Sequence, residues 1–151
     1  NINIFDYHKH PNTPVNAQER PEMILRGHEK EGYGIAWNPN NKGCLLSGAD
    51  DNTIYIWNIE GKEYDGGFLD PLEQFKGHDS VVEDVAWHKT DENLFGSVSD
   101  DKKLKIWDYR VSKQDSIYTV IAHTEEILSL DFSPFQDRML LTSSVDKTVK
   151  L

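Results

Sequence analysis

Cysteine is nearly absent from the chain, and so are long apolar runs. The one cysteine, Cys44, cannot close an internal disulfide, and its apolar neighbours in "GCLL" favour a buried structural thiol over a reactive one. No apolar stretch approaches the roughly 18 residues of a membrane-spanning helix, and no secretory signal is recognisable. The sequence therefore predicts a soluble intracellular protein without a membrane partner.

Basic residues and cofactor motifs are also scarce. The chain has 16 Lys and Arg against 26 Asp and Glu, a net charge of -10. Because such a surface repels phosphate and no basic patch is present, we expect no direct binding of nucleic acid. An acidic concave surface would instead concentrate a cationic partner. No glycine-rich phosphate loop, CxxC pair or GxSxG motif occurs, so no cofactor is predicted.

The chain does contain an internal repeat. Histidine, a small hydroxyl residue, aspartate and tryptophan recur in register. His28 precedes Trp57 by 29 residues, and His78 precedes Trp107 by the same number. The same spacing from His123 predicts a tryptophan at position 152, so we expect this chain to be an excerpt of a longer protein. The aligned segments are 25–58, 75–108 and 120–151.

Each repeat unit contains four short β-rich runs, one before the histidine and three after it, bounded by turn residues. Four short strands in 40 to 50 residues are typical of β-propeller blades. "NIFDY" copies "KIWDY", with Phe5 at the place of Trp107, so the chain begins on the third strand of an earlier blade. We predict one all-β domain over residues 1–151, an open propeller arc. It comprises complete blades at 33–76 and 82–121, with partial blades at 1–26 and 127–151.

These repeats resemble the WD40 family, with small departures such as Ala122-His123 for Gly-His and Trp57-Asn58 for Trp-Asp. The resemblance implies that the recurring side chains form a hydrogen-bonded tetrad that holds the strands of each blade together. The tetrad residues would be His28, Ser47, Asp51 and Trp57; His78, Ser97, Asp101 and Trp107; and His123, Thr142 and Asp146.

The same Ser, His and Asp residues could be read as the catalytic triad of a hydrolase. A catalytic site needs one nucleophile facing one cleft, whereas this set occurs three times and has Thr142 in place of serine. The three histidines belong to different blades, and His8 and His10, beside Pro11, have no third ligand nearby. We therefore predict neither an enzyme nor a metal site.

The start of the innermost strand is the candidate binding position. Tyr33, Glu83 and Leu128 lie five residues after the histidines, and Glu31 and Glu126 lie three residues after. We predict that these five residues line a peptide-binding channel mouth. The alternative is that Glu83 only protects a strand edge from pairing.

The segments "KEGYG", "VVEDV" and "ENLFGSV" are similar to the histone-binding WD-repeat subfamily, which includes the retinoblastoma-binding chaperone proteins and the small subunit of chromatin assembly factor. This implies a non-enzymatic seven-bladed scaffold in chromatin-assembly and chromatin-modifying complexes, located in the nucleus, with a cytoplasmic pool left open. Histone H3 and H4 tails would be its ligands, with Glu31, Tyr33 and Glu83 as contacts, and Leu128 replaces a polar residue of the subfamily.

Two further expectations follow. The alternative function is a WD40 scaffold with a different client, such as a ubiquitin-ligase substrate receptor or a ribosome-biogenesis factor. We also expect the open blade faces to make copies of this chain associate, because such faces leave apolar surface and strand edges uncovered.

Overall fold

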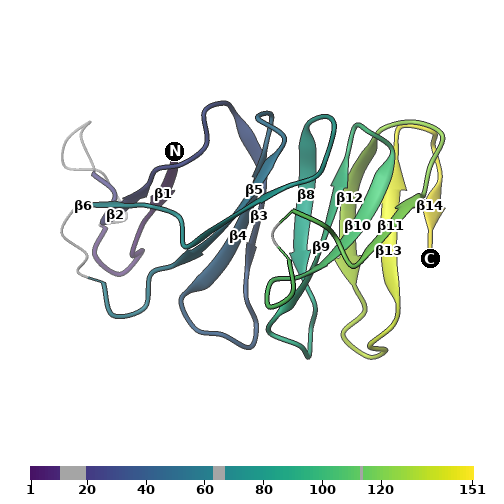
Figure 1. Ribbon diagram of the computed structural model, residues 1–151. Helices are drawn as coiled ribbons and strands as arrows, with labels where there is room; N and C mark the ends of the chain where they lie inside the picture. Colours follow the sequence, from purple (N-terminus) through teal and green to yellow (C-terminus); the bar gives the residue numbers. More distant parts are fainter. Residues whose placement is uncertain (11–19, 63–66, 113) are drawn as a thin grey trace.

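The computed structural model describes residues 1–10, 20–62, 67–112 and 114–151, and its strands form four sheets (Figure 1). The predicted all-β class is confirmed. Within these ranges, no helix has the length and the apolar composition that a membrane crossing requires. The sheets follow one another along the chain, as expected for blades.

Two four-stranded antiparallel sheets form the centre of the molecule. From the inner to the outer strand, the first contains β3 (Gly32–Trp37), β4 (Cys44–Ala49), β5 (Thr53–Asn58) and β7 (Glu73–Lys76). The second contains β8 (Val82–Trp87), β9 (Leu94–Ser99), β10 (Lys103–Asp108) and β11 (Tyr118–Ile121). In both sheets the strands follow chain order from the inner to the outer strand.

Two three-stranded sheets flank this centre. One contains β1 (Ile2–Ile4), β2 (Met23–Leu25) and β6 (Gly67–Leu69), and the other contains β12 (Ile127–Phe132), β13 (Leu140–Ser144) and β14 (Val149–Lys150). Strand β6 was not expected: it comes from the linker between β5 and β7 and pairs in parallel with β2 of the preceding sheet. Residues 11–19, 63–66 and 113 of the predicted blades lie outside the described residues.

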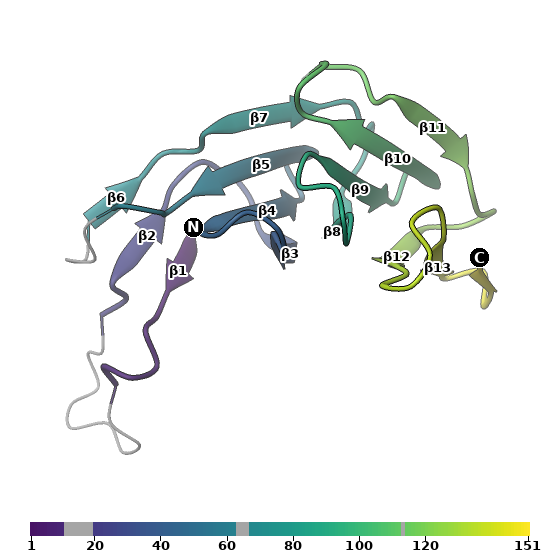
Figure 2. The ribbon, with the colours of Figure 1, turned by 90° about the horizontal axis from the view of Figure 1, so that it is seen from below.

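The four sheets stand side by side along an open arc (Figure 2). Strands β3, β8 and β12 line its concave side, while β7 and β11 lie on the convex side. The two ends of the arc do not meet, so the prediction of an open propeller arc is confirmed. The concave side would therefore line the predicted channel, and the ends of its strands would form the channel mouth.

The hydrophobic core is divided into three layers, one between each pair of neighbouring sheets. The first is built around Leu25 and Trp57, the second around Phe75 and Trp107, and the third around Ile127. Every residue of β4 is buried because sheets cover both of its faces. Each fully buried large apolar side chain contributes about 1.5–3 kcal/mol, so most of the stability comes from these layers.

Contacts on the concave side fix the inner strands relative to one another. A Cβ atom on Gly34 would lie 2.9 Å from the Cα atom of Asp84, so β3 and β8 approach at backbone distance. The Asp84 Oδ2 atom accepts hydrogen bonds from the Ser129 hydroxyl at 2.8 Å and from the Leu130 amide at 3.0 Å. The inner strands of three consecutive sheets are therefore linked directly.

The alignment of Phe5 with Trp107 does not extend to packing. Trp107 is completely buried in β10, whereas Phe5 lies just after β1 and is 51% exposed. Among the described residues, the sheet of β1, β2 and β6 has no inner strand against which this ring could pack. Phe5 instead meets the His10 ring edge-on at 5.4 Å.

Candidate functional site

The four predicted tetrad residues of the second complete blade lie together. The Trp107 indole N–H donates to Ser97 Oγ at 2.8 Å, and Ser97 Oγ lies 2.7 Å from His78 Nε2. His78 Nδ1 in turn lies 2.8 Å from Asp101 Oδ2. One proton arrangement satisfies every group: the serine hydroxyl donates to Nε2, and the Nδ1–H of a neutral imidazole donates to the carboxylate.

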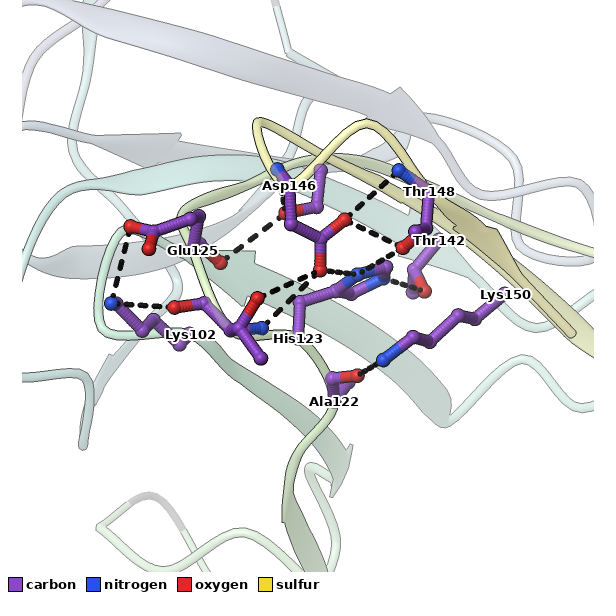
Figure 3. A network of polar contacts seen from close by, with 10 residues as sticks. Lys102, Ala122, His123, Glu125, Thr142, Asp146, Thr148 and Lys150 are labelled. Carbon is purple, nitrogen blue, oxygen red and sulfur yellow. Dashed lines mark hydrogen bonds and ion pairs between the residues drawn. The ribbon is translucent and has the colours of Figure 1, made fainter.

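The other two repeats have the same geometry. His28 lies between Ser47 at 2.7 Å and Asp51 at 3.1 Å, and Trp57 donates to Ser47 at 2.9 Å. His123 lies between Thr142 and Asp146, at 2.9 Å from each (Figure 3). The three sites recur at the same place in each sheet, where the loop from the preceding outer strand enters the inner strand.

The tetrad aspartates also bind backbone amides. Asp101 accepts hydrogen bonds from the amides of Asp79 at 3.1 Å and Lys103 at 2.9 Å, which joins the loop before β8 to the turn between β9 and β10. Burial of the Asp101 carboxyl opposes its ionisation, but the interactions with His78 and the hydrogen bonds from the Asp79 and Lys103 amides outweigh burial and lower its pKa to about 2. The ionised carboxylate is therefore the form that the fold stabilises.

In the other two tetrads, the pKa values of His28 and Asp146 are both lowered. Burial lowers the pKa of His28, although the nearby Asp51 carboxylate partly opposes this. The Thr148 hydroxyl is the main cause that lowers the pKa of Asp146, as expected for a carboxylate that accepts several hydrogen bonds (Figure 3). In all three tetrads the interactions of the aspartate lower its pKa and favour its ionised form.

The Ser97 hydroxyl does not face a cleft. Ser97 is completely buried, and its oxygen accepts the tryptophan N–H while its proton is directed to the histidine. A serine nucleophile needs space for a substrate carbonyl beside its oxygen. The arrangement serves to hold the strands of a sheet together, and functional residues have to be sought elsewhere.

An acidic rim lies at the same end of the sheets, on the loops and turns that carry the tetrads. Burial raises the pKa of Glu83, and the neighbouring Asp100 and Asp50 carboxyl groups raise it further. Burial also raises the pKa of Asp100, together with the negative charge of Glu126. Asp50, Glu83, Asp100 and Glu126, which come from three neighbouring sheets, are thus linked by the charges that act on Glu83 and Asp100, and we call them the acidic cluster.

The remaining predicted rim residues border this cluster. The charge of Asp50 raises the pKa of the Tyr33 hydroxyl, with smaller contributions from burial, Glu31 and Glu83. The Tyr33 side chain is 60% exposed and that of Leu128 is 48% exposed. Of the five predicted channel-mouth residues, Glu83 and Glu126 belong to the cluster, Tyr33 interacts with it and with Glu31, and Leu128 adds an apolar surface on β12.

The sequence matches the family described as WD domain, G-beta repeat, over residues 19–58, 69–108 and 114–151. The chain belongs to the WD40 repeat family. WD40 repeats are generally non-catalytic scaffolds for protein–protein interaction, which agrees with the buried tetrads and directs attention to the rim.

The sequence analysis did not identify two residues of the acidic rim, Asp50 and Asp100. Their amides donate to the carbonyl oxygens of Glu31 at 2.8 Å and Val81 at 3.2 Å, which places them beside the loop before each inner strand. The doubled aspartates at 50–51 and 100–101 were the available signal, because each tetrad uses only the second of the pair. In the third repeat Val145 takes this place, so the acidic cluster is strongest on the first two complete blades.

The other chemically interesting side chains have structural partners. His10 Nε2 lies 3.1 Å from Glu22 Oε1, and no group of three potential metal ligands occurs in the described ranges. Burial and the charge of Glu92 raise the pKa of the Cys44 thiol to about 11. This thiol therefore stays protonated and poorly nucleophilic at neutral pH.

Proposed function

We propose that this WD40 chain binds Arg- and Lys-rich peptide segments, namely histone tails, at its acidic rim, and that it works in the nucleus as a non-enzymatic subunit of chromatin-assembly or chromatin-modifying complexes. The observation that carries the proposal is the cluster of Asp50, Glu83, Asp100 and Glu126, in which neighbouring negative charges add to burial in raising the pKa of Glu83 and Asp100. A cationic ligand would relieve this repulsion. The subfamily resemblance of "KEGYG" and "VVEDV" supports histones as the ligands.

The chemistry of the rim suits an arginine. A guanidinium group can form two parallel hydrogen bonds with one carboxylate, and it stacks readily on an aromatic face. Glu83 and Asp100 would supply the carboxylates, and the exposed Tyr33 ring would supply the aromatic face. In the described part of the chain, the buried Asp50 Oδ1 atom accepts no hydrogen bond, so an N–H donor from the peptide would satisfy it.

The test is a fluorescence-anisotropy titration of the full chain with labelled H3 and H4 N-terminal peptides. We expect binding that weakens several-fold between about 50 and 200 mM salt, because exposed charges are screened over this range. Glu31→Gln should weaken binding, whereas Glu92→Gln, a matched exposed carboxylate on the loop at the opposite end of β9, should not. Equal affinity for scrambled peptides of the same composition would show charge attraction without histone recognition.

One observation favours a second candidate, a WD40 scaffold with a non-histone client. Leu128 places an exposed apolar side chain where the histone-binding subfamily has a polar residue. A client with an apolar residue next to its basic one would use this surface, as a ubiquitin-ligase substrate or a ribosome-assembly partner could. If histones are the ligands, Leu128→Gln should raise the affinity for the H3 peptide, and a loss of affinity would favour the second candidate.

A further inference from the structure

The three outer strands that precede the tetrad histidines have different edges. The edge of β2 is covered by β6, whereas β7 and β11 are the last strands of their sheets among the described residues (Figure 2). On β7 the exposed side chains are polar, Gln74 and Lys76. On β11 they include Tyr118, which is 58% exposed, and Ile121, which is 72% exposed.

Strand β6 shows how the outer edge of a blade binds an extended segment. It runs parallel to β2, with Phe68 opposite Ile24 and Leu69 opposite Leu25, and the Arg26 amide donates to the Leu69 carbonyl at 2.9 Å. The Phe68 ring lies 3.1 Å from the Arg26 guanidinium carbon. Leu69 packs against the core layer around Trp57. Backbone pairing and two apolar side chains thus hold three residues in place.

The backbone of β11 presents the same kind of edge. The Ala122 amide donates to the Lys102 carbonyl of the β10 side at 3.1 Å. Because inward and outward amides alternate along an antiparallel strand, the amides of Thr119 and Ile121 point away from β10. These amides are the donors that an added strand would use.

The side chains of β11 also match the edge that β6 covers. Counting back from the tetrad histidine, Val120 takes the place of Leu25 and Ile121 takes the place of Arg26. In β2 these are the positions that meet Leu69 and Phe68. Ile121 therefore offers an aliphatic surface where β2 offers a guanidinium, and this surface suits an apolar side chain.

Charged residues or proline normally prevent an exposed edge strand from pairing with another chain. Strand β7 follows this rule with Lys76, while β11 has neither a charged residue nor a proline. The unprotected edge is therefore consistent with a binding role.

We propose that the β11 edge binds an extended apolar segment of a partner protein, which adds to the sheet as a parallel fifth strand in the way that β6 adds to β2. This site is separate from the acidic rim and would recognise a different part of a partner. A second copy of the chain would not reproduce the pairing, because a two-fold axis makes identical edge strands antiparallel. The required partner chemistry is two adjacent bulky apolar residues in an extended backbone.

The experiment uses the amide spectrum of the isotopically labelled full chain. The probe is a blocked synthetic peptide, GGFLDPL, which has the sequence around β6. We expect shift changes and slower hydrogen exchange at Thr119 and Ile121 on titration, with unchanged amides in β7. Ile121→Lys should weaken peptide binding at least tenfold, and Lys76→Gln on β7, at the matching position, should leave it unchanged. Circular dichroism identical to that of the unsubstituted chain shows that each variant is folded.

Three results would overturn the proposal. The first is an absence of change at Thr119 and Ile121 at millimolar peptide concentration. The second is a change confined to β2, which would mean that the peptide only displaces β6. The third is a change at β11 that depends on the concentration of the chain without peptide, which would indicate that two copies pair through this edge.

Discussion

At the scale of single residues, binding and stability are assigned to different side chains. The tetrads are buried hydrogen-bonded networks in which each member satisfies another, while the rim carboxyl groups are neighbours of like charge. Removing one member of a buried network leaves its partner unsatisfied, at a cost of about 1–3 kcal/mol. Removing one of several like charges relieves repulsion. Tetrad substitutions should therefore affect folding, and rim substitutions should affect ligands.

The pH dependence of stability tests the role of Asp101. Its pKa is about 2 in the folded chain and about 3.9 in an unfolded one, so its stabilising contribution is complete above pH ~4 and is lost as the pH falls towards 2. We predict that Asp101→Asn lowers the free energy of unfolding by about 1–3 kcal/mol at neutral pH. The difference from the unsubstituted chain should shrink between pH 4 and pH 2 in urea titrations. A difference that stays constant over this range would contradict the assignment.

At the scale of elements, the turns at the opposite end of the sheets link neighbouring blades. His88 accepts the Asp91 amide at 3.1 Å through Nδ1, and its Nε2–H donates to the Asp137 carbonyl of the next blade at 2.6 Å. Asn38 makes the same pattern one blade earlier, with its Nδ2 donating to the Glu92 carbonyl at 2.9 Å. The two side chains are therefore equivalent links.

This equivalence makes a prediction about His88. His88→Asn should keep the free energy of unfolding within about 1 kcal/mol of the original, because an amide can make both kinds of hydrogen bond. His88→Ala should lower it by about 1–3 kcal/mol, since buried donors and acceptors lose their partners. Urea titration measures both variants. Equal destabilisation by alanine and asparagine would show that ring packing against Phe132, at 5.2 Å, dominates.

Some elements could be predicted from the sequence and others could not. The spacing from His78 to Trp107 helped to identify the strands, because the first complete repeat has the same spacing and the other repeated residues keep their register in the third. Strand β6 could not be predicted, because three residues in a linker carry no periodic pattern and their pairing partner belongs to the preceding blade. The positive φ of Lys102, 65°, was equally hidden, since lysine does not favour that conformation. Asp50 and Asp100 escaped notice because each stands beside a tetrad aspartate.

At the scale of the whole molecule, both ends of the arc expose apolar side chains. Ile35 and Trp37 are more than half exposed on β3, beside the incomplete first sheet, and Leu141 and Val149 are exposed on the last sheet. We predict that copies of the chain associate through these end faces, so that sedimentation equilibrium gives a mass above 17.4 kDa. Leu141→Lys should reduce association, and Val111→Lys, on an exposed loop away from the end faces, should not. A single 17.4 kDa species at micromolar concentration would contradict this prediction.

The most direct test of the account compares the affinity of two variants for the H3 peptide at a temperature at which both are folded. Glu83→Gln removes a rim charge, and Ser97→Ala removes a tetrad hydroxyl. The account predicts that Glu83→Gln weakens binding about five- to tenfold, the loss of about 1–1.4 kcal/mol expected for one charge-assisted contact, and that Ser97→Ala binds like the original chain. Unchanged binding by Glu83→Gln together with weakened binding by folded Ser97→Ala would contradict it.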